Sequence, residues 1–289
     1  MFACTPHPGL GTVAIQRPAI VQVVDLATCR ERTIHRRAAP PSTPGLTVAV
    51  RKTSQSIVYR GHTVLTVRED HTRAPAGMPG PIVLLDLSPD RRWIMFAIDP
   101  QGSASLAADG LFIRVVSTAG GQSHPLGVAL GYDDYRAWCG GRLVFTAGGD
   151  REATRFKRLE IAAPPSWKAR PLTALRERAW GSLACAPDGR SVVVQSQPAA
   201  ELPNFFATRW QLWRVGLDGT TTQLTQPPVQ HADESPHFSH DGRTIYFVRS
   251  RRGHGQLYAL RGGRTIGPLL SLGYSVGYYG ANAWAYTVR

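Results

Sequence analysis

The feature that most constrains this chain is a turn motif that recurs at 87–96, 185–194 and 238–247. Each copy has an apolar strand end, a turn resembling Ser/Ala-Pro-Asp-Gly, a basic residue and an alternating apolar strand. Proline fixes φ at the start of the turn, and Asp-Gly tolerates the positive φ of a tight hairpin. The alternation predicts one buried face formed by the following residues: Ile94, Phe96, Val192, Val194, Ile245 and Phe247.

The spacing of the copies gives the size of the repeating unit. Asp90 and Asp188 are 98 positions apart, whereas Asp188 and Asp241 are 53 apart. The longer gap contains a degenerate copy at 137–145, with a Gly-Gly turn. The period is therefore close to fifty residues, which is the size of one four-stranded propeller blade.

The rest of each repeat agrees with a blade. We expect third strands at 111–116, 156–161, 211–215 and 256–260, each followed by a turn and a short closing strand. A weaker blade is expected from runs at 46–50, 56–59 and 63–67.

The two ends of the chain carry incomplete repeats. Residues 20–26 and 32–35 read as third and fourth strands, and 274–278 and 283–286 supply first-strand material. The ends are therefore expected to complete one blade together and leave no open sheet edge. We predict an all-β fold, with 1–289 as a single β-propeller domain of six four-stranded blades; seven blades are the alternative. Residues 1–9 are expected to be a flexible segment.

The best repeat, 232–258, resembles the WD40-like repeat of TolB-family propellers, which also occurs in the propellers of prolyl-oligopeptidase-type peptidases. His240 stands where the family usually has proline. TolB itself is periplasmic and binds partner proteins through its propeller, so the resemblance implies an interaction module of the bacterial envelope or exterior. TolB also carries a separate N-terminal α/β domain that this chain has no room for, which argues against a role in the Tol system.

Motifs for catalysis are incomplete. Neither 102–106 nor 181–183 completes a Gly-x-Ser-x-Gly nucleophile elbow. The glycine-rich stretches end strands without leading into helices, so no phosphate loop is predicted. His237 and His240 fall on opposite sides of a strand, which disfavours a shared metal. We therefore predict no catalytic residue, no metal site and no cofactor.

The strongest candidates for binding are polar residues in loops that lead into innermost strands, because such loops rim a propeller's central channel. His231, Asp233 and Glu234 lie in one such loop, and Asp133 and Asp134 lie in the matching loop of an earlier blade. Together the four acids would make an acidic mouth that holds a cation or a basic peptide.

The cysteines bear on localisation. Cys4 and Cys29 would form a disulfide if the protein is exported, whereas Cys185 reads as a small core hydrophobe. The tetrapeptide 1–4 resembles the end of a bacterial lipoprotein signal whose upstream part is missing, which makes Cys4 an alternative lipid anchor and membrane tether. With an upstream export signal the protein would be periplasmic, extracellular or envelope-attached; otherwise it would be cytoplasmic. There is no apolar run of 18 residues for a membrane-spanning helix.

Charge leaves three functional hypotheses. The net charge is +13, and all but three of the 33 basic residues are arginines, which are scattered in ones and twos. The first hypothesis is a non-catalytic, monomeric propeller that binds a protein or glycan. The second is a propeller lyase or hydrolase acting on an anionic polysaccharide through channel-rim residues. The third, binding of nucleic acid through surface arginines, is the least favoured, because no continuous basic stripe is present.

Overall fold

The structure, a computed structural model, describes residues 3–16, 20–35, 44–51, 54–68, 82–99, 109–155, 157–199, 209–275 and 284–289. Within these ranges the chain is built from β-strands and one 3-10 turn, η2 (Asp133–Tyr135), with no α-helix. Accordingly, no helix in the described part is long and apolar enough to span a bilayer. The chain divides into two compact units, Met1–Ala39 with Glu152–Arg155 and Thr173–Arg289, and Pro40–Arg151 with Phe156–Leu172.

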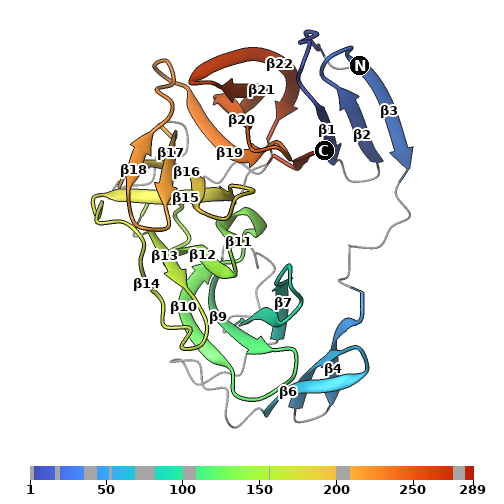
Figure 1. Cartoon of the computed structure of the whole chain (residues 1–289), viewed down its shortest axis with the longest axis vertical. Coiled ribbons are helices and arrows are strands. Elements are labelled where there is room, and N and C mark those ends of the chain that lie inside the picture. The colour runs from blue at the N-terminus through green and yellow to red at the C-terminus, as the bar shows by residue number, and fades with distance from the viewer. Residues whose placement is uncertain are drawn as a thin grey trace. The chain divides into compact units, whose positions relative to one another are not determined.

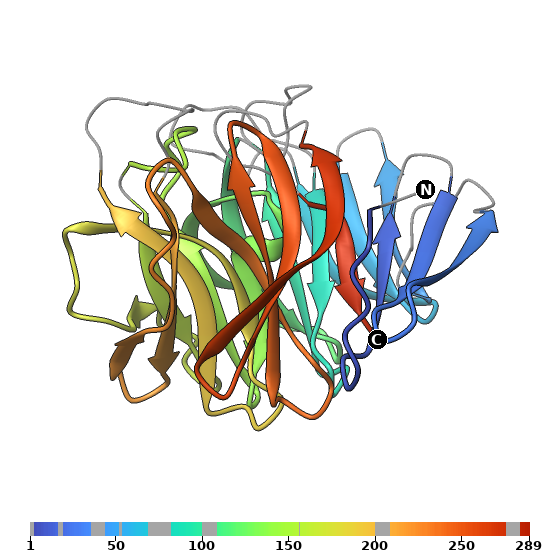
Figure 2. The same ribbon diagram turned by 90° about the horizontal axis from the view of Figure 1, so that it is seen from above.

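The first unit contains three four-stranded antiparallel sheets, each with the strand number of a propeller blade (Figure 1). The strong twist of the third is plain in Figure 2. In pairing order the sheets are β23 (Tyr286–Val288), β1 (Thr12–Gln16), β2 (Ile20–Asp25) and β3 (Arg30–His35); β15 (Arg178–Cys185), β16 (Ser191–Pro198), β17 (Gln211–Gly216) and β18 (Thr221–Gln223); and β19 (Ala232–Phe238), β20 (Thr244–Arg251), β21 (His254–Arg261) and β22 (Arg264–Tyr274).

The expectation that the two ends share a sheet is confirmed. β23 pairs antiparallel with β1, with Ala14 opposite Thr287, and the C-terminus lies beside β1 in Figure 1. The number of strands from each end differs from the prediction, because the N-terminal segment supplies three strands and the C-terminal segment only one. Tyr274 belongs to the end of β22, and residues 276–283 lie outside the described residues.

The second unit contains a three-stranded and an eight-stranded sheet. In the larger sheet, β10 and β12 share a single paired position, Ala129 opposite Ala147, which joins two successive four-stranded groups. The sheets are β4 (Leu46–Arg51), β5 (Ser54–Tyr59) and β6 (His62–Arg68); and β7 (Ile82–Leu87), β8 (Trp93–Ile98), β9 (Gly110–Ser117), β10 (His124–Leu130), β11 (Arg136–Cys139), β12 (Arg142–Ala147), β13 (Arg158–Ala162) and β14 (Arg170–Pro171). The degenerate repeat is confirmed as the β11–β12 hairpin, with Gly140 and Gly141 both at positive φ.

Apolar clusters fill the space between neighbouring sheets. In the first unit, one cluster joins β1 and β2 to β20–β22, and another joins β16 and β17 to β20 and β21. In the second unit, β4–β6 pack on β7–β9, and β8–β10 pack on β12. Strands covered on both faces read as continuous apolar runs, as in the fully buried Val192, Val193 and Val194. The six residues predicted to form a buried face are all buried.

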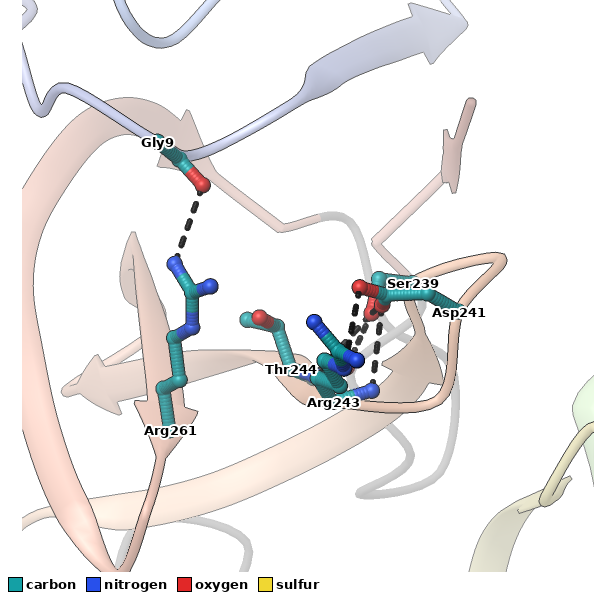
Figure 3. Close-up of polar contacts among 6 residues, drawn as sticks. All are labelled: Gly9, Ser239, Asp241, Arg243, Thr244 and Arg261. Atoms are coloured by element: carbon teal, nitrogen blue, oxygen red, sulfur yellow. Dashed lines mark hydrogen bonds and ion pairs between the residues drawn. The ribbon is translucent and has the colours of Figure 1, made fainter.

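In each copy of the recurring turn, the aspartate accepts a hydrogen bond from the backbone N–H two residues further on. In the β19–β20 turn, Ser239 Oγ donates to Asp241 Oδ1 at 2.6 Å, and the N–H groups of Arg243 and Thr244 donate to Asp241 Oδ1 and Ser239 Oγ (Figure 3). The hydrogen bond from Ser239 is the main reason that the pKa of Asp241 is lowered. Gly242, which follows the aspartate, has a φ of +69°, a left-handed conformation that favours glycine, although Arg91 takes the same place in the first copy with a φ of +57°.

The serine of this turn is absent from one copy, which gives a matched test. Ser88, which is buried, bonds Asp90 Oδ1 and accepts from Trp93 N–H, whereas Ala186 takes the same place before Asp188. Replacing Ser88 by alanine is expected to lower the free energy of unfolding by about 1–2 kcal/mol, because a backbone donor loses its acceptor. Ala186→Ser should raise it. Urea denaturation measures both; equal and opposite small shifts support the role of the hydroxyl, and a stabilised Ser88→Ala variant would contradict it.

The N-terminal segment lies against two sheets, which does not fit the expectation that residues 1–9 are flexible. Cys4 forms an antiparallel bridge with Leu270 of β22, and Arg261 donates to the carbonyl of Gly9 (Figure 3). A disulfide joins Cys4 to Cys29, which lies in the turn between β2 and β3. Further backbone bonds run from Thr5 to Leu269, from Ser271 to Ala3 and from His7 to Leu26.

The disulfide corrects two expectations about cysteines. A sulfur bonded to Cys29 has no valence left for a thioether, so the lipid-anchor alternative at Cys4 is not retained. None of the four cysteines is free, and Cys139 and Cys185 are also disulfide-bonded, so the interpretation of Cys185 as a core hydrophobe is wrong. Cys139 ends β11 and Cys185 ends β15, so the two take equivalent places in the repeat.

Removing the Cys4–Cys29 bond is expected to lower the free energy of unfolding by about 2–4 kcal/mol. The bond closes a loop of 25 positions, and without it the unfolded chain has more conformational entropy. Cys4→Ser, Cys29→Ser and the double replacement should melt at the same temperature, measured by calorimetry without reductant. If the two single variants kept the melting temperature of the parent, the bond would not stabilise the fold.

Candidate functional site

Three of the residues predicted from sequence lie at the start of β19, one in the preceding turn and two in the strand. His231 lies in a turn in which its N–H donates to Pro228 O at 3.0 Å, and its Nδ1 lies 3.0 Å from Val229 O. The imidazole of His231 is therefore bound to its own loop and partly exposed. Asp233 and Glu234, by contrast, are buried within β19 itself.

A β-bulge interrupts β19 immediately after these acids. Glu234 pairs with Val248 and His237 with Tyr246, so Ser235 and Pro236 together lie opposite one residue of β20. Proline has no N–H to give to a ladder, and Ser235 adopts a φ of +52°. The bulge thus follows from a proline in the middle of a strand.

Side chains from two other sheets hold the bulge in place. The Ser235 N–H donates to Gln195 Oε1 of β16 at 3.0 Å, and the Tyr286 hydroxyl of β23 donates to Ser235 O. Gln195 reaches this position because Gly181 is opposite, where a Cβ would lie 2.6 Å from the amide nitrogen. Both backbone groups of the bulged residue are therefore fixed from outside its own sheet.

Asp233 forms the tightest charged contact of the site. Arg249 donates through Nε to Oδ1 at 2.7 Å and through Nη2 to Oδ2 at 2.9 Å, and the Asp233 side chain is completely buried. The Arg249 guanidinium carbon lies 4.9 Å from the centre of the Tyr258 ring. Burial by itself would lower the pKa of Arg249, but the hydrogen bond and charge of Asp233 outweigh it and raise that pKa. This bidentate pair fixes the start of β19 to β20.

Glu234 contacts the C-terminal segment. Trp284 Nε1 donates to Glu234 Oε1 at 3.4 Å, and both side chains are buried. The indole of Trp284 occupies the space that a Cβ on Gly255 of β21 would need. We call Asp233, Glu234 and Ser235, with Gln195, Arg249, Trp284 and Tyr286, the β19 site.

The other predicted pair, Asp133 and Asp134, lies in η2 of the second unit. Asp133 is exposed and accepts from Nη2 of the buried Arg136 at 2.7 Å, while Arg136 Nη1 donates to Tyr132 O. The two acidic pairs therefore belong to separate compact units, and a shared acidic mouth stays a prediction.

His231 and His237 lie too far along the chain to act together as ligands, since six residues of extended strand span about 20 Å. His237 Nδ1 lies 3.2 Å from Ser235 O, and its ring is 4.5 Å from that of Tyr286. No group of three or more His, Cys, Asp or Glu side chains able to hold a metal occurs in the described ranges.

Several residues of the β19 site were not predicted from sequence. Gln195 and Tyr286 come from other sheets and Arg249 from the neighbouring strand β20, and none of the three had a motif to mark it. The available signal was Pro236, because a proline inside an apolar, alternating strand indicates a bulge and therefore outside partners for the freed backbone groups.

Comparisons with known proteins show the fold. No protein-family model matches the chain, and no curated protein matches its sequence. Among solved structures, a putative TolB from Agrobacterium tumefaciens matches 96% of this chain and 95% of its own, with a TM-score of 0.51 and 15% identity. A puromycin hydrolase matches 97% of this chain but 46% of its own, with a TM-score of 0.50 and 12% identity. The fold is thus a TolB-like β-propeller, as the repeat predicted, while the number of blades stays a prediction.

Proposed function

We propose that this chain is an exported TolB-like propeller that binds a protein or glycan partner and carries out no reaction on it. The observation that carries the proposal is that polar groups of the β19 site are bound to one another, within the sheet of β19 and from two other sheets. The carboxylate of Asp233 is bound by the guanidinium of Arg249. The backbone N–H and carbonyl of Ser235 are bound by Gln195 and Tyr286. Such groups hold the start of β19 and its bulge in one conformation, which favours a preorganised binding surface. A general acid or base must instead reach its substrate.

Two further observations support the proposal. The putative TolB resembles this chain over nearly the whole of both molecules, whereas the hydrolase has more than half of its length outside the shared region. The disulfide between Cys4 and Cys29, and the bonded state of Cys139 and Cys185, fit an oxidising compartment such as the periplasm or the exterior.

Binding and catalysis are separated by following the fate of the ligand. The purified chain is titrated calorimetrically with a panel of neutral and uronate-containing glycans and envelope proteins, and each ligand is then recovered for mass spectrometry. Saturable binding with the ligand intact supports the proposal. Fragmentation of a polysaccharide by catalytic amounts of protein would replace it with the lyase or hydrolase alternative. A duplex DNA control, bound with a steep salt dependence, would favour the nucleic-acid alternative.

Compartment is tested separately by thiol labelling. In protein taken from its native cells under denaturing, non-reducing conditions, all four cysteines should resist a maleimide reagent. Free labelling of all four would contradict export and leave the binding test unaffected.

A further inference from the structure

A second polar cluster of the first unit lies where β15, β16 and β17 meet. Arg178, the first residue of β15, stacks on Trp213 of β17, with the guanidinium carbon 4.6 Å from the ring centre. Its Nε donates to Ser196 Oγ at 2.9 Å and its Nη2 to Gln211 Oε1 at 3.3 Å. The three side chains around Arg178 are therefore all neutral.

Arg178 is a half-buried cation without an acidic partner among the described residues. A guanidinium has five N–H donors in a fixed fork, and two of those of Arg178 have protein acceptors. Burial lowers the pKa of Arg178, and no carboxylate opposes that effect. Arg249, buried to a similar degree in the next sheet, has the carboxylate of Asp233 on its fork. Partly desolvating a charge without a counter-charge costs stability, so Arg178 stands out as a cation that an anion would compensate.

The same cluster holds a further donor without an acceptor. The Nε1 atom of Trp213 is buried and has no hydrogen-bond partner in the described part of the chain. A buried indole N–H ordinarily finds an acceptor. The start of β17 and its neighbours are thus rich in donors and poor in acceptors, and a bound oxyanion supplies acceptors and negative charge together.

We propose that Arg178 and Trp213 form a binding site for the carboxylate of a small acidic molecule, either a simple carboxylic acid or a uronic acid sugar. The guanidinium fork matches the two oxygens of a planar carboxylate, and both side chains are half-buried, so a ligand reaches them from solvent. This site is distinct from the β19 site, and the proposal stands whether the partner of the propeller is a protein or a glycan.

The probes are acetate and D-glucuronate, with D-glucose and phosphate as comparisons at constant ionic strength. The readout is the indole Nε1–H resonance of Trp213 in ¹⁵N-labelled protein, assigned with Trp213→Phe. We expect saturable shifts with acetate and glucuronate at about millimolar affinity and none with glucose. A response to glucuronate but not to acetate would identify the sugar acid as the source of the carboxylate.

Variants connect the signal to Arg178. Arg178→Gln should weaken carboxylate binding by at least about tenfold, because charge-assisted hydrogen bonds contribute most of it. Arg178→Lys should weaken carboxylate binding less, since it keeps the charge but loses the fork. If Arg178→Gln does not fold, Arg178→Lys serves as the test variant, and unchanged carboxylate affinity in it would contradict the role of the fork. Arg214→Gln, a neighbour on the opposite, exposed face of β17, is the matched control and should bind as the parent does.

Four outcomes would overturn the proposal. They are the absence of any acetate- or glucuronate-dependent shift, an equal affinity in Arg178→Gln, a response to glucose equal to that to glucuronate, and tighter binding of phosphate than of either carboxylate. A polyglutamate peptide is tested in parallel, and a shift seen only with this peptide, which is a case of the first outcome, would favour an acidic protein segment instead.

Discussion

Replacing Asp233 by asparagine is expected to lower the free energy of unfolding by about 3–5 kcal/mol, because it leaves the guanidinium of Arg249 in a buried position without its counter-charge. Both oxygens of Asp233 accept hydrogen bonds from Arg249, and the Asp233 side chain has no exposed surface. The change keeps the shape of the side chain, so packing is preserved while the charge is lost. Urea denaturation followed by tryptophan fluorescence measures the difference.

The same sheet provides a matched control for this prediction. Asp241 Oδ2 lies 3.9 Å from Arg243 Nε, and both side chains are exposed. Asp241→Asn therefore removes a charge from a solvated pair. Its effect should be far smaller than that of Asp233→Asn. Replacing both buried partners, as in Asp233→Leu with Arg249→Met, should recover much of the loss, because no unpaired charge remains. Equal effects of Asp233→Asn and Asp241→Asn would show that burial does not set the strength of the pair.

The register of the β19–β20 hairpin explains why this ion pair was not foreseen. The turn at 239–243 is readable from sequence, and counting back from it without interruption places Asp233 opposite Ser250. The bulge at Ser235 and Pro236 shifts the pairing by one residue and places Asp233 opposite Arg249. The sequence alone places Asp233 in the loop before the innermost strand, as a channel-rim acid, whereas it lies within β19 and its carboxylate is bound within the sheet.

Local turn chemistry accounts for the parts of the fold that sequence did predict. Asp-Gly and Gly-Gly turns fix hairpins within a few residues, so the blade repeat, the buried strand faces and the shared terminal sheet followed from pattern alone. The β1 strand, Thr12–Gln16, was missed because it is only five residues long and has no copy of the recurring turn beside it. The bonds from Gln195 and Tyr286 to Ser235 join residues 40 and 51 positions apart, a separation at which single-sequence patterns carry no signal.

Trp284→Ala is expected to lower the free energy of unfolding by about 3–5 kcal/mol, because a buried indole is removed and a cavity is left between the terminal segment and β21. The variant also removes the donor to Glu234 Oε1. Thermal unfolding by calorimetry measures the loss. If Trp284 contributed little to packing, the variant would have the same melting temperature as the parent.

Gly255 provides the complementary test, because a Cβ at this position would overlap the Trp284 ring. Gly255→Ala in the parent should cost about 1–3 kcal/mol through overpacking. In the Trp284→Ala background the same methyl group enters the vacated space, so its cost should vanish or change sign, and the two changes will be strongly non-additive. Gly11→Ala is the control, since its Cβ would lie 3.4 Å from Arg289 O, an ordinary contact. Additive effects of Gly255→Ala and Trp284→Ala would mean that the indole does not rest on Gly255, and the link between Glu234 and the C-terminal segment would need another explanation.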